Sequence, residues 1–373
     1  MSNPGRSYCY NVIILMRLLL VVLCLCLSFN FAFAAELGKP PTFPQDLTGL
    51  RLPPPEKAFG GVEVLLATPL SLNPKYREAS RQFFSTFYLG ASTPTIDWTG
   101  NRASCNEGVT SLAFRDAILL RLNYFRAMAG VPAQVAFSDT YGAKDQKAAL
   151  MMSVNNQLSH SPPSNWICYS ADGYDAAQHS NLALGADGWD AINLYFADYG
   201  TGSAGHRRWI LYPQTQHMGT GDLPNDEAGR AANALWIMDE HLWDSRPSTR
   251  EEYVAWPPPG YVPYQVVYPY WSFSYASANF SGAAVSMTEN GAEVSVALET
   301  VANGYGENTL VWTPKGMGSR DVWPKPSADT HYRVTLSDVF IDGSPRSFTY
   351  SVTVIDPATI SVPGLPFLPL LLD

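Results

Sequence analysis

The sequence predicts an α+β protein with two regions, a helical one followed by one made of β-strands. Apolar residues recur at helical spacing through much of residues 114–199, whereas strict alternation interrupted by glycine turns is typical of residues 262–356. Between the two, the proline-rich segment 256–260 marks a boundary, because proline and glycine interrupt regular structure. We therefore expect a linker at residues 246–261.

The composition indicates a globular, acidic protein. Of the 373 residues, 46% are hydrophobic and 15% are charged, which is enough apolar material for one large or two modest cores. The formal net charge is -9. Because an acidic chain binds nucleic acids and anionic membrane surfaces poorly, we expect neither as a partner.

The first 34 residues have the features of a signal peptide. Arg6 and Arg17 precede the apolar run at 18–27, and small residues at 32 and 34 suit signal peptidase. The run is short for a membrane-spanning helix. We expect cleavage, a secreted or periplasmic location and no stable membrane insertion afterwards. Residues 35–61 read as a proline-rich arm or linker, and residues 62–110 as an extension with a short helix at 76–88.

Three longer helices are predicted in the first region, at 114–129, 139–158 and 189–199. The first helix has one apolar face, made of Ile118, Leu122, Phe125 and Ala129. It is expected to end at Gly130-Val131-Pro132. Ser138 or Asp139 is a suitable N-cap for the second. Short strands are expected near 216–221 and 233–238.

The second region reads as paired strands. Residues 283–287 and 294–298 alternate around the tight turn at Asn290-Gly291, and residues 332–340 and 347–355 flank Asp342-Gly343. With Trp312 as a core anchor, this spacing predicts an immunoglobulin-like β-sandwich at 262–356, followed by a tail at 357–373.

Two cysteines remain after removal of the leader. Cys105 and Cys168 in an exported protein predict one disulfide, the alternative being two buried thiols.

Histidines are the main polar signal. Of six, His160 and His206 follow predicted helices, and neutral imidazoles that converge there suit a divalent metal such as Zn²⁺. The alternative is a polar cleft held by hydrogen bonds. Three other features are expected to be unremarkable chemically. Arg207 and Arg208 should pair with acids on the surface, His217 should face solvent from a strand, and Asp239-Glu240-His241 should not bind metal, because adjacent side chains point to different sides.

Four motifs, taken together in this order, resemble the CAP superfamily of cysteine-rich secretory, antigen 5 and pathogenesis-related 1 proteins, or SCP domains. They read LNYFRAMAGVP (122–132), AALMMSVNNQLSHSPP (148–163), SNLALG (180–185) and GHRRWILYPQTQHMGTG (205–221). Among members of this superfamily, the four motifs are most similar to those of bacterial proteins. The resemblance implies an α-β-α sandwich over about residues 111–245, with a cleft of two histidines and two acids that holds a divalent metal in several members.

Only part of that cleft is carried over. His160 and His206 match the two histidines, Ser180 and Asn181 stand in a motif where glutamate precedes asparagine, and Asp198 is a shortened second acid. Because Ser180 cannot act as a base at neutral pH, we expect no catalysis. The predicted function is binding of a lipid or other small hydrophobic ligand, an extracellular protein or a cell-envelope component. The alternative is a metal-dependent hydrolase of peptide or cell-wall material, using His160, His206 and Asp198.

Overall fold

The computed structural model describes residues 69–90 and 94–359. The predicted signal peptide, the proline-rich arm and most of the predicted tail lie outside the described residues. Everything described falls within one compact unit, Leu37–Asp373. Among the described residues, no helix has the length and apolar character needed to cross a membrane.

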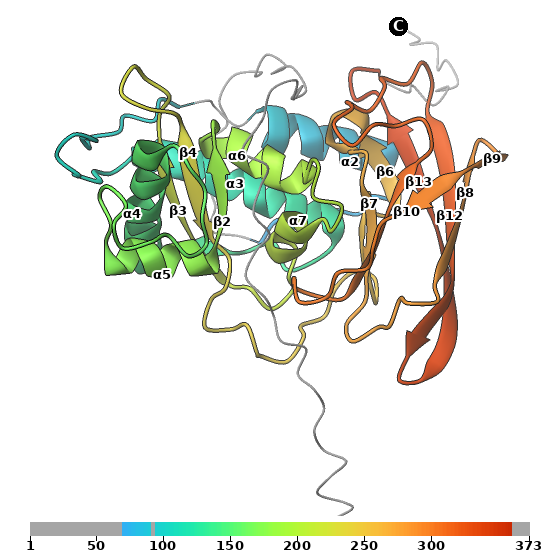
Figure 1. The fold of residues 1–373 in the computed structure, drawn as a ribbon. Helices are drawn as coiled ribbons and strands as arrows, with labels where there is room; N and C mark the ends of the chain where they lie inside the picture. The colour runs from blue at the N-terminus through green and yellow to red at the C-terminus, as the bar shows by residue number, and fades with distance from the viewer. Residues whose placement is uncertain (1–68, 91–93, 360–373) are drawn as a thin grey trace, which may run out of the picture. The chain divides into compact units, whose positions relative to one another are not determined.

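The first region is a four-stranded sheet with helices on both faces (Figure 1). The strand order is β1 (Ala136–Phe137), β3 (His217–Leu223), β4 (Ala232–Trp236) and β2 (Ser180–Leu184). One face is covered by α4 (Asp139–Asn155) and α5 (Ala171–His179), the other by α3 (Leu112–Ala129) and α6 (Gly188–Ala197). The short α7 (Gly205–Ile210) follows α6. The layers are therefore α-β-α.

The helix ends follow from local chemistry that the sequence already shows. The Ser111 hydroxyl accepts a hydrogen bond from Phe114 N at 3.2 Å and begins α3, which ends at Gly130 with φ 81°. Ser138 caps α4 in the same way, and α4 ends at Asn155, earlier than expected, because Asn156 adopts a left-handed conformation. Helix α5 was not predicted, since its nine residues are too few for a clear apolar repeat.

The second region consists of two facing sheets. One has the order β10-β11-β7-β5 and the other β6-β13-β12-β8-β9. Their strands are β5 (Val254–Trp256), β6 (Gly260–Pro263), β7 (Trp271–Ser274), β8 (Ala284–Glu289), β9 (Ala292–Val294), β10 (Val296–Leu298), β11 (Thr309–Pro314), β12 (Thr330–Ile341) and β13 (Ser344–Ile355), with a 3₁₀ turn η2 (Tyr264–Val266) after β6. Aromatic rings fill the space between the sheets, with Trp271 5.5 Å from Tyr332 and Phe273 5.0 Å from Phe348. Trp312 is fully buried, as expected of a core residue.

Two expectations for this region are wrong in detail. The segment 246–261 is not a free linker, because it contains β5 and the start of β6, and the fully buried Trp256 packs against Phe196 of α6 at 4.4 Å. Proline and glycine mark the ends of these strands, which is why composition alone suggested a linker. The alternating stretch 294–298 is also not one strand. It divides into β9 and β10, which belong to different sheets, because the chain crosses between them at Ser295.

The predicted extension packs against the second region. Residues 77–89 form α2 (Arg77–Phe83) and a continuing π-helical segment η1 (Phe84–Leu89), close to the predicted helix at 76–88. The Arg77 guanidinium forms an ion pair with Asp329, the residue before β12, at 2.8 Å.

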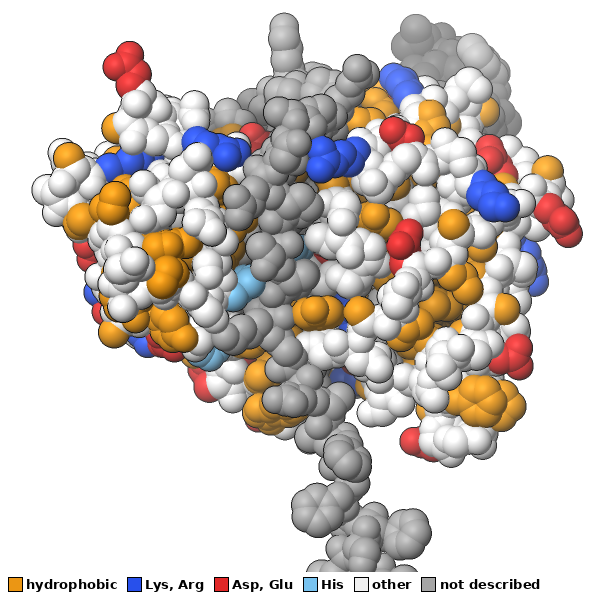
Figure 2. Space-filling model, viewed as in Figure 1, with side chains coloured by type: hydrophobic (Ala, Val, Ile, Leu, Met, Phe, Trp, Pro, Cys, Tyr) orange, Lys and Arg blue, Asp and Glu red, His pale blue; other side chains and the backbone are white. Residues whose placement is uncertain are grey.

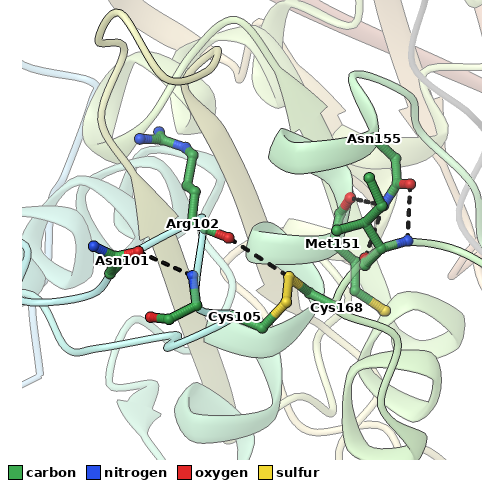
Figure 3. Close-up of a disulfide and its surroundings, with 8 residues drawn as sticks. Asn101, Arg102, Cys105, Met151, Asn155 and Cys168 are labelled. Atoms are coloured by element: carbon green, nitrogen blue, oxygen red, sulfur yellow. Dashed lines mark hydrogen bonds between the residues drawn. A yellow bond between two sulfur atoms is a disulfide. The ribbon is translucent and has the colours of Figure 1, made fainter.

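The predicted disulfide between Cys105 and Cys168 is present, with the two Cα atoms 5.2 Å apart. It joins the loop before α3 to the loop before α5 (Figure 3). Around it, Cys168 Sγ lies 3.8 Å from the carbonyl oxygen of Arg102, and the Asn155 side chain exchanges hydrogen bonds with the backbone of Ile167. The bridge thus links two connections that each lead into a helix.

Candidate functional site

The predicted cleft residues Asp198 and His206 lie together at the junction of α6 and α7. Asp198 follows α6 in a left-handed conformation, φ 57°, and α7 begins seven residues later at Gly205. This turn brings His206 Nδ1 to 2.8 Å from Asp198 Oδ1. Both side chains are fully buried.

Asp198 also accepts hydrogen bonds from the start of α7. Its Oδ2 accepts from the backbone N–H of His206 at 2.9 Å and of Arg207 at 3.2 Å, and its Oδ1 accepts from Thr201 Oγ1 at 2.5 Å. Burial acts to raise the pKa of Asp198, but the charge of His206 and these hydrogen bonds outweigh it, so the pKa lies below its ordinary value. The carboxylate therefore serves as a charged cap of α7.

Ser180, where the resemblance implies an acid, is paired with an acid from another element. Its hydroxyl donates to Asp145 Oδ1 at 2.6 Å, and Asp145 Oδ2 accepts from the backbone N–H of Trp236 at 2.8 Å. Burial raises the pKa of Asp145 to about 8. Sequence reasoning missed Asp145, although its position is three and seven residues before Ala148 and Met152, on the inward face of α4.

The other two predicted cleft residues make separate contacts. His160 Nδ1 lies 2.6 Å from the carbonyl oxygen of Ala177 in α5. Asn181, in β2, donates from Nδ2 to the carbonyl oxygen of His206 at 3.2 Å. The structure thus joins His206 to Asp198 and to Asn181, and it joins Ser180 to Asp145.

The expectation that Arg207 and Arg208 are surface residues is wrong, since both are buried. Arg207 donates to the carbonyl oxygens of Phe196 at 2.6 Å and Tyr270 at 2.7 Å, and Arg208 donates to that of Ala302 at 2.7 Å. Tyr270 and Ala302 belong to the second region, so the carbonyls that these arginines satisfy come from both regions. Two adjacent arginines in a sequence predict exposure to solvent. A buried guanidinium, however, can donate hydrogen bonds to several backbone carbonyls at once. Burial lowers the pKa of each to about 10.

A second histidine group lies elsewhere in the first region. His217, Asp239, Glu240 and His241 place one ligand atom each within 4.8 Å of one another, and in the described part of the chain this is the one group of three or more potential metal ligands so placed. The expectation that residues 239–241 point apart is therefore wrong. These residues leave β4 and enter a turn, where the alternation of a strand no longer applies.

A cavity of about 300 Å³ lies where the segment before α3 meets the start of α4. Val109, Phe137 and Ala143 supply apolar walls, and Gly142 and Arg115 also line it. Arg115 Nη1 is 4.0 Å from Asp139 Oδ1, and the buried Arg115 Nε donates no hydrogen bond to any residue that the structure describes. The volume is at the lower end of the range for small-molecule sites.

Residues 119–239 match the family model of CAP, the cysteine-rich secretory protein family. The match runs from the middle of α3 to the third residue after β4 and includes Asp198, His206 and Ser180, so it supports the resemblance of the first region to the CAP superfamily. No curated protein matches the chain.

Proposed function

We propose that this protein is an exported CAP-domain protein that binds a small, largely apolar molecule without turning it over. The observation that carries the proposal is the 300 Å³ cavity beside α4, where apolar walls meet the guanidinium of Arg115. Such a combination suits an apolar body with one hydrogen-bond acceptor.

The charges at the cavity refine the class of ligand. Glu107 and Asp139 line it together with Arg115, so carboxylates outnumber the cation. An uncharged acceptor, such as the hydroxyl of a fatty alcohol, suits the Arg115 guanidinium without repulsion from the two acids. A fatty-acid anion fits less well.

The absence of turnover is supported by how the cleft groups are used. Ser180 replaces the acid, and its hydroxyl is committed to Asp145. Asp198 accepts hydrogen bonds from two backbone N–H groups of α7 and from Thr201, and it also pairs with the His206 ring. A general base needs a carboxylate or imidazole within reach of its substrate, and these groups are bound to each other inside the fold.

Export is supported by the disulfide and by the predicted leader, because disulfides persist in oxidising compartments. Nucleic acid is not proposed as a partner, since the net charge is -9 and Lys and Arg side chains on the face in Figure 2 stand apart from one another. We also propose that the protein is of the bacterial type and that its two facing sheets form an immunoglobulin-like sandwich.

The ligand test uses 1-decanol and decanoate as probes in calorimetric titration. We expect decanol to bind more tightly, and Gly142→Leu to abolish binding by filling the cavity. A side chain at position 142 is tolerated by the backbone, because its Cβ would meet Thr220 O at 3.5 Å, an ordinary contact. Gly282→Leu is the matched control, since its Cβ meets nothing within 4 Å. Decanol binding that survives Gly142→Leu would contradict the cavity as the site.

The turnover test incubates the protein with peptide and ester substrates. We expect no products. Hydrolysis that is lost in His160→Ala would overturn the proposal and favour the metal-dependent hydrolase instead.

A further inference from the structure

We propose that His217, Glu240 and His241 form a divalent-metal site, with Zn²⁺ the best-suited ion, held in place by Asp239. We call these four residues the His217 cluster. It lies outside the predicted cleft and shares no residue with the cavity proposed above, so it is independent of the proposed function.

Glu240 stands between the two imidazoles. Its Oε1 lies 2.9 Å from His217 Nδ1 and 3.5 Å from His241 Nε2. Zinc binds nitrogen and carboxylate oxygen at about 2.0 to 2.2 Å, so two ligand atoms on one ion lie at most about 4 Å apart. With all ligand atoms within 4.8 Å, rotations of exposed side chains bring them to one ion.

Asp239 positions the ligands and does not bind the ion itself, because both of its carboxylate oxygens accept hydrogen bonds from backbone N–H groups. Oδ2 accepts from the N–H of Gln216 at 2.8 Å and of His217 at 2.7 Å, and Oδ1 accepts from the N–H of His241 at 3.3 Å. A single buried carboxylate thus fixes the backbone of both histidines. Its negative charge beside the ligands also favours a cation.

The surrounding contacts are those that orient metal ligands. His241 Nδ1 lies 2.7 Å from Asp244 Oδ2, which leaves Nε2 on the side of Glu240. Histidine ligands commonly use their second nitrogen in this way, on a carboxylate. Tyr141 donates to Glu240 Oε2 at 2.6 Å, and its ring stacks on Trp236 at 4.5 Å, which fixes the tyrosine.

One of the three ligands, His217, borders a cavity. A cavity of about 500 Å³ is lined by His217 and Asp244, together with Gln214 and Gln216. Three protein ligands leave one position of a tetrahedral ion for water, and water reaches the cluster because the side chains of His217 and Glu240 are 41% and 55% exposed.

The test is titration of the purified protein, free of any polyhistidine tag, with Zn²⁺ alone in a calorimeter. We expect one high-affinity ion per chain. His241→Ala and His217→Ala should each weaken binding about 100-fold, and Asp244→Asn, which acts only through His241, about 10-fold. Far-ultraviolet circular dichroism of each variant checks that the fold is retained.

His331→Ala is the matched control, because His331 is a histidine of β12 in the other region, and it should bind Zn²⁺ as the parent does. Two results would overturn the proposal. One is absence of stoichiometric Zn²⁺ binding, which would leave the cluster as an ion-pair network. The other is binding that is lost in His160→Ala or His206→Ala but unchanged in a folded His241→Ala variant.

Discussion

The two histidine groups of the first region use similar side chains in opposite ways. His206 and Asp198 are fully buried, whereas the side chains of His217 and Glu240 are 41% and 55% exposed. In the buried pair, the carboxylate is saturated by donors from α7 and Thr201. In the exposed group, Glu240 contacts both histidines, and His217 also lines a cavity. The difference indicates that burial decides whether such a group holds the fold together or stays available to an ion.

Removing the buried carboxylate should have the largest effect. Asp198→Ala leaves a buried imidazole, a nearby buried guanidinium and two N–H groups without their anion, so we expect the free energy of unfolding to fall by about 3 to 5 kcal/mol. Urea denaturation measures this. Glu240→Ala is the exposed counterpart, and an equal loss there would erase the contrast between the two groups.

Loss of the disulfide should come next. The bridge closes a sequence separation of 63 residues, so replacing Cys105 and Cys168 by serine should lower the free energy of unfolding by roughly 2 to 4 kcal/mol. Because the His217 cluster lies outside the closed loop, its Zn²⁺ affinity should not change. Calorimetric titration of the double variant checks this, and weaker Zn²⁺ binding would show that the exposed cluster depends on the bridge.

Asp145 should make stability fall as pH rises. Burial raises its pKa to about 8, against about 3.9 in an unfolded chain. Between these values the folded state holds a proton that the unfolded state has released. The contribution is therefore complete below about pH 4 and is lost as pH rises through about 8, at up to about 1.4 kcal/mol per pH unit.

The measurement is urea unfolding at several pH values in that window, for the parent and for Asp145→Asn, which resembles the protonated acid. The variant should show a flatter profile. Asp198, whose pKa is lowered, acts with the opposite sign, since its contribution is present above the unfolded pKa and is lost as pH falls. Identical profiles for the parent and Asp145→Asn would show that Asp145 is ionised in the fold at neutral pH.

The smallest effect is expected at the exposed group without metal. Glu240→Gln removes a charge but keeps an acceptor, so thermal unfolding should change by less than about 1 kcal/mol. With Zn²⁺ present, the difference between parent and variant should widen, because an ion that binds only the folded state stabilises it. A large destabilisation in the absence of metal would make Glu240 a structural residue like Asp198.

Much of the local structure was predictable because short-range rules decide it. Gly130 ends α3, Ser138 begins α4, Asn290-Gly291 is a hairpin turn as expected, and Asp342-Gly343 joins the two expected strands. The disulfide was predictable by elimination of the leader cysteines. The motifs that resemble the CAP family lie in the matched region, and they gave His206 and Asp198 as cleft candidates before any geometry was known.

What the chain order could not reveal were the partners of these residues. Asp145 meets Ser180 across 35 positions, Arg207 reaches Tyr270 across 63, and His217 meets Glu240 across 23. Such contacts depend on how layers pack, and a charged side chain carries no local sign of whether it will be buried. Local sequence therefore determined the helices, the turns and the cleft candidates. Only the tertiary fold decided which charged side chains became buried and which remained exposed.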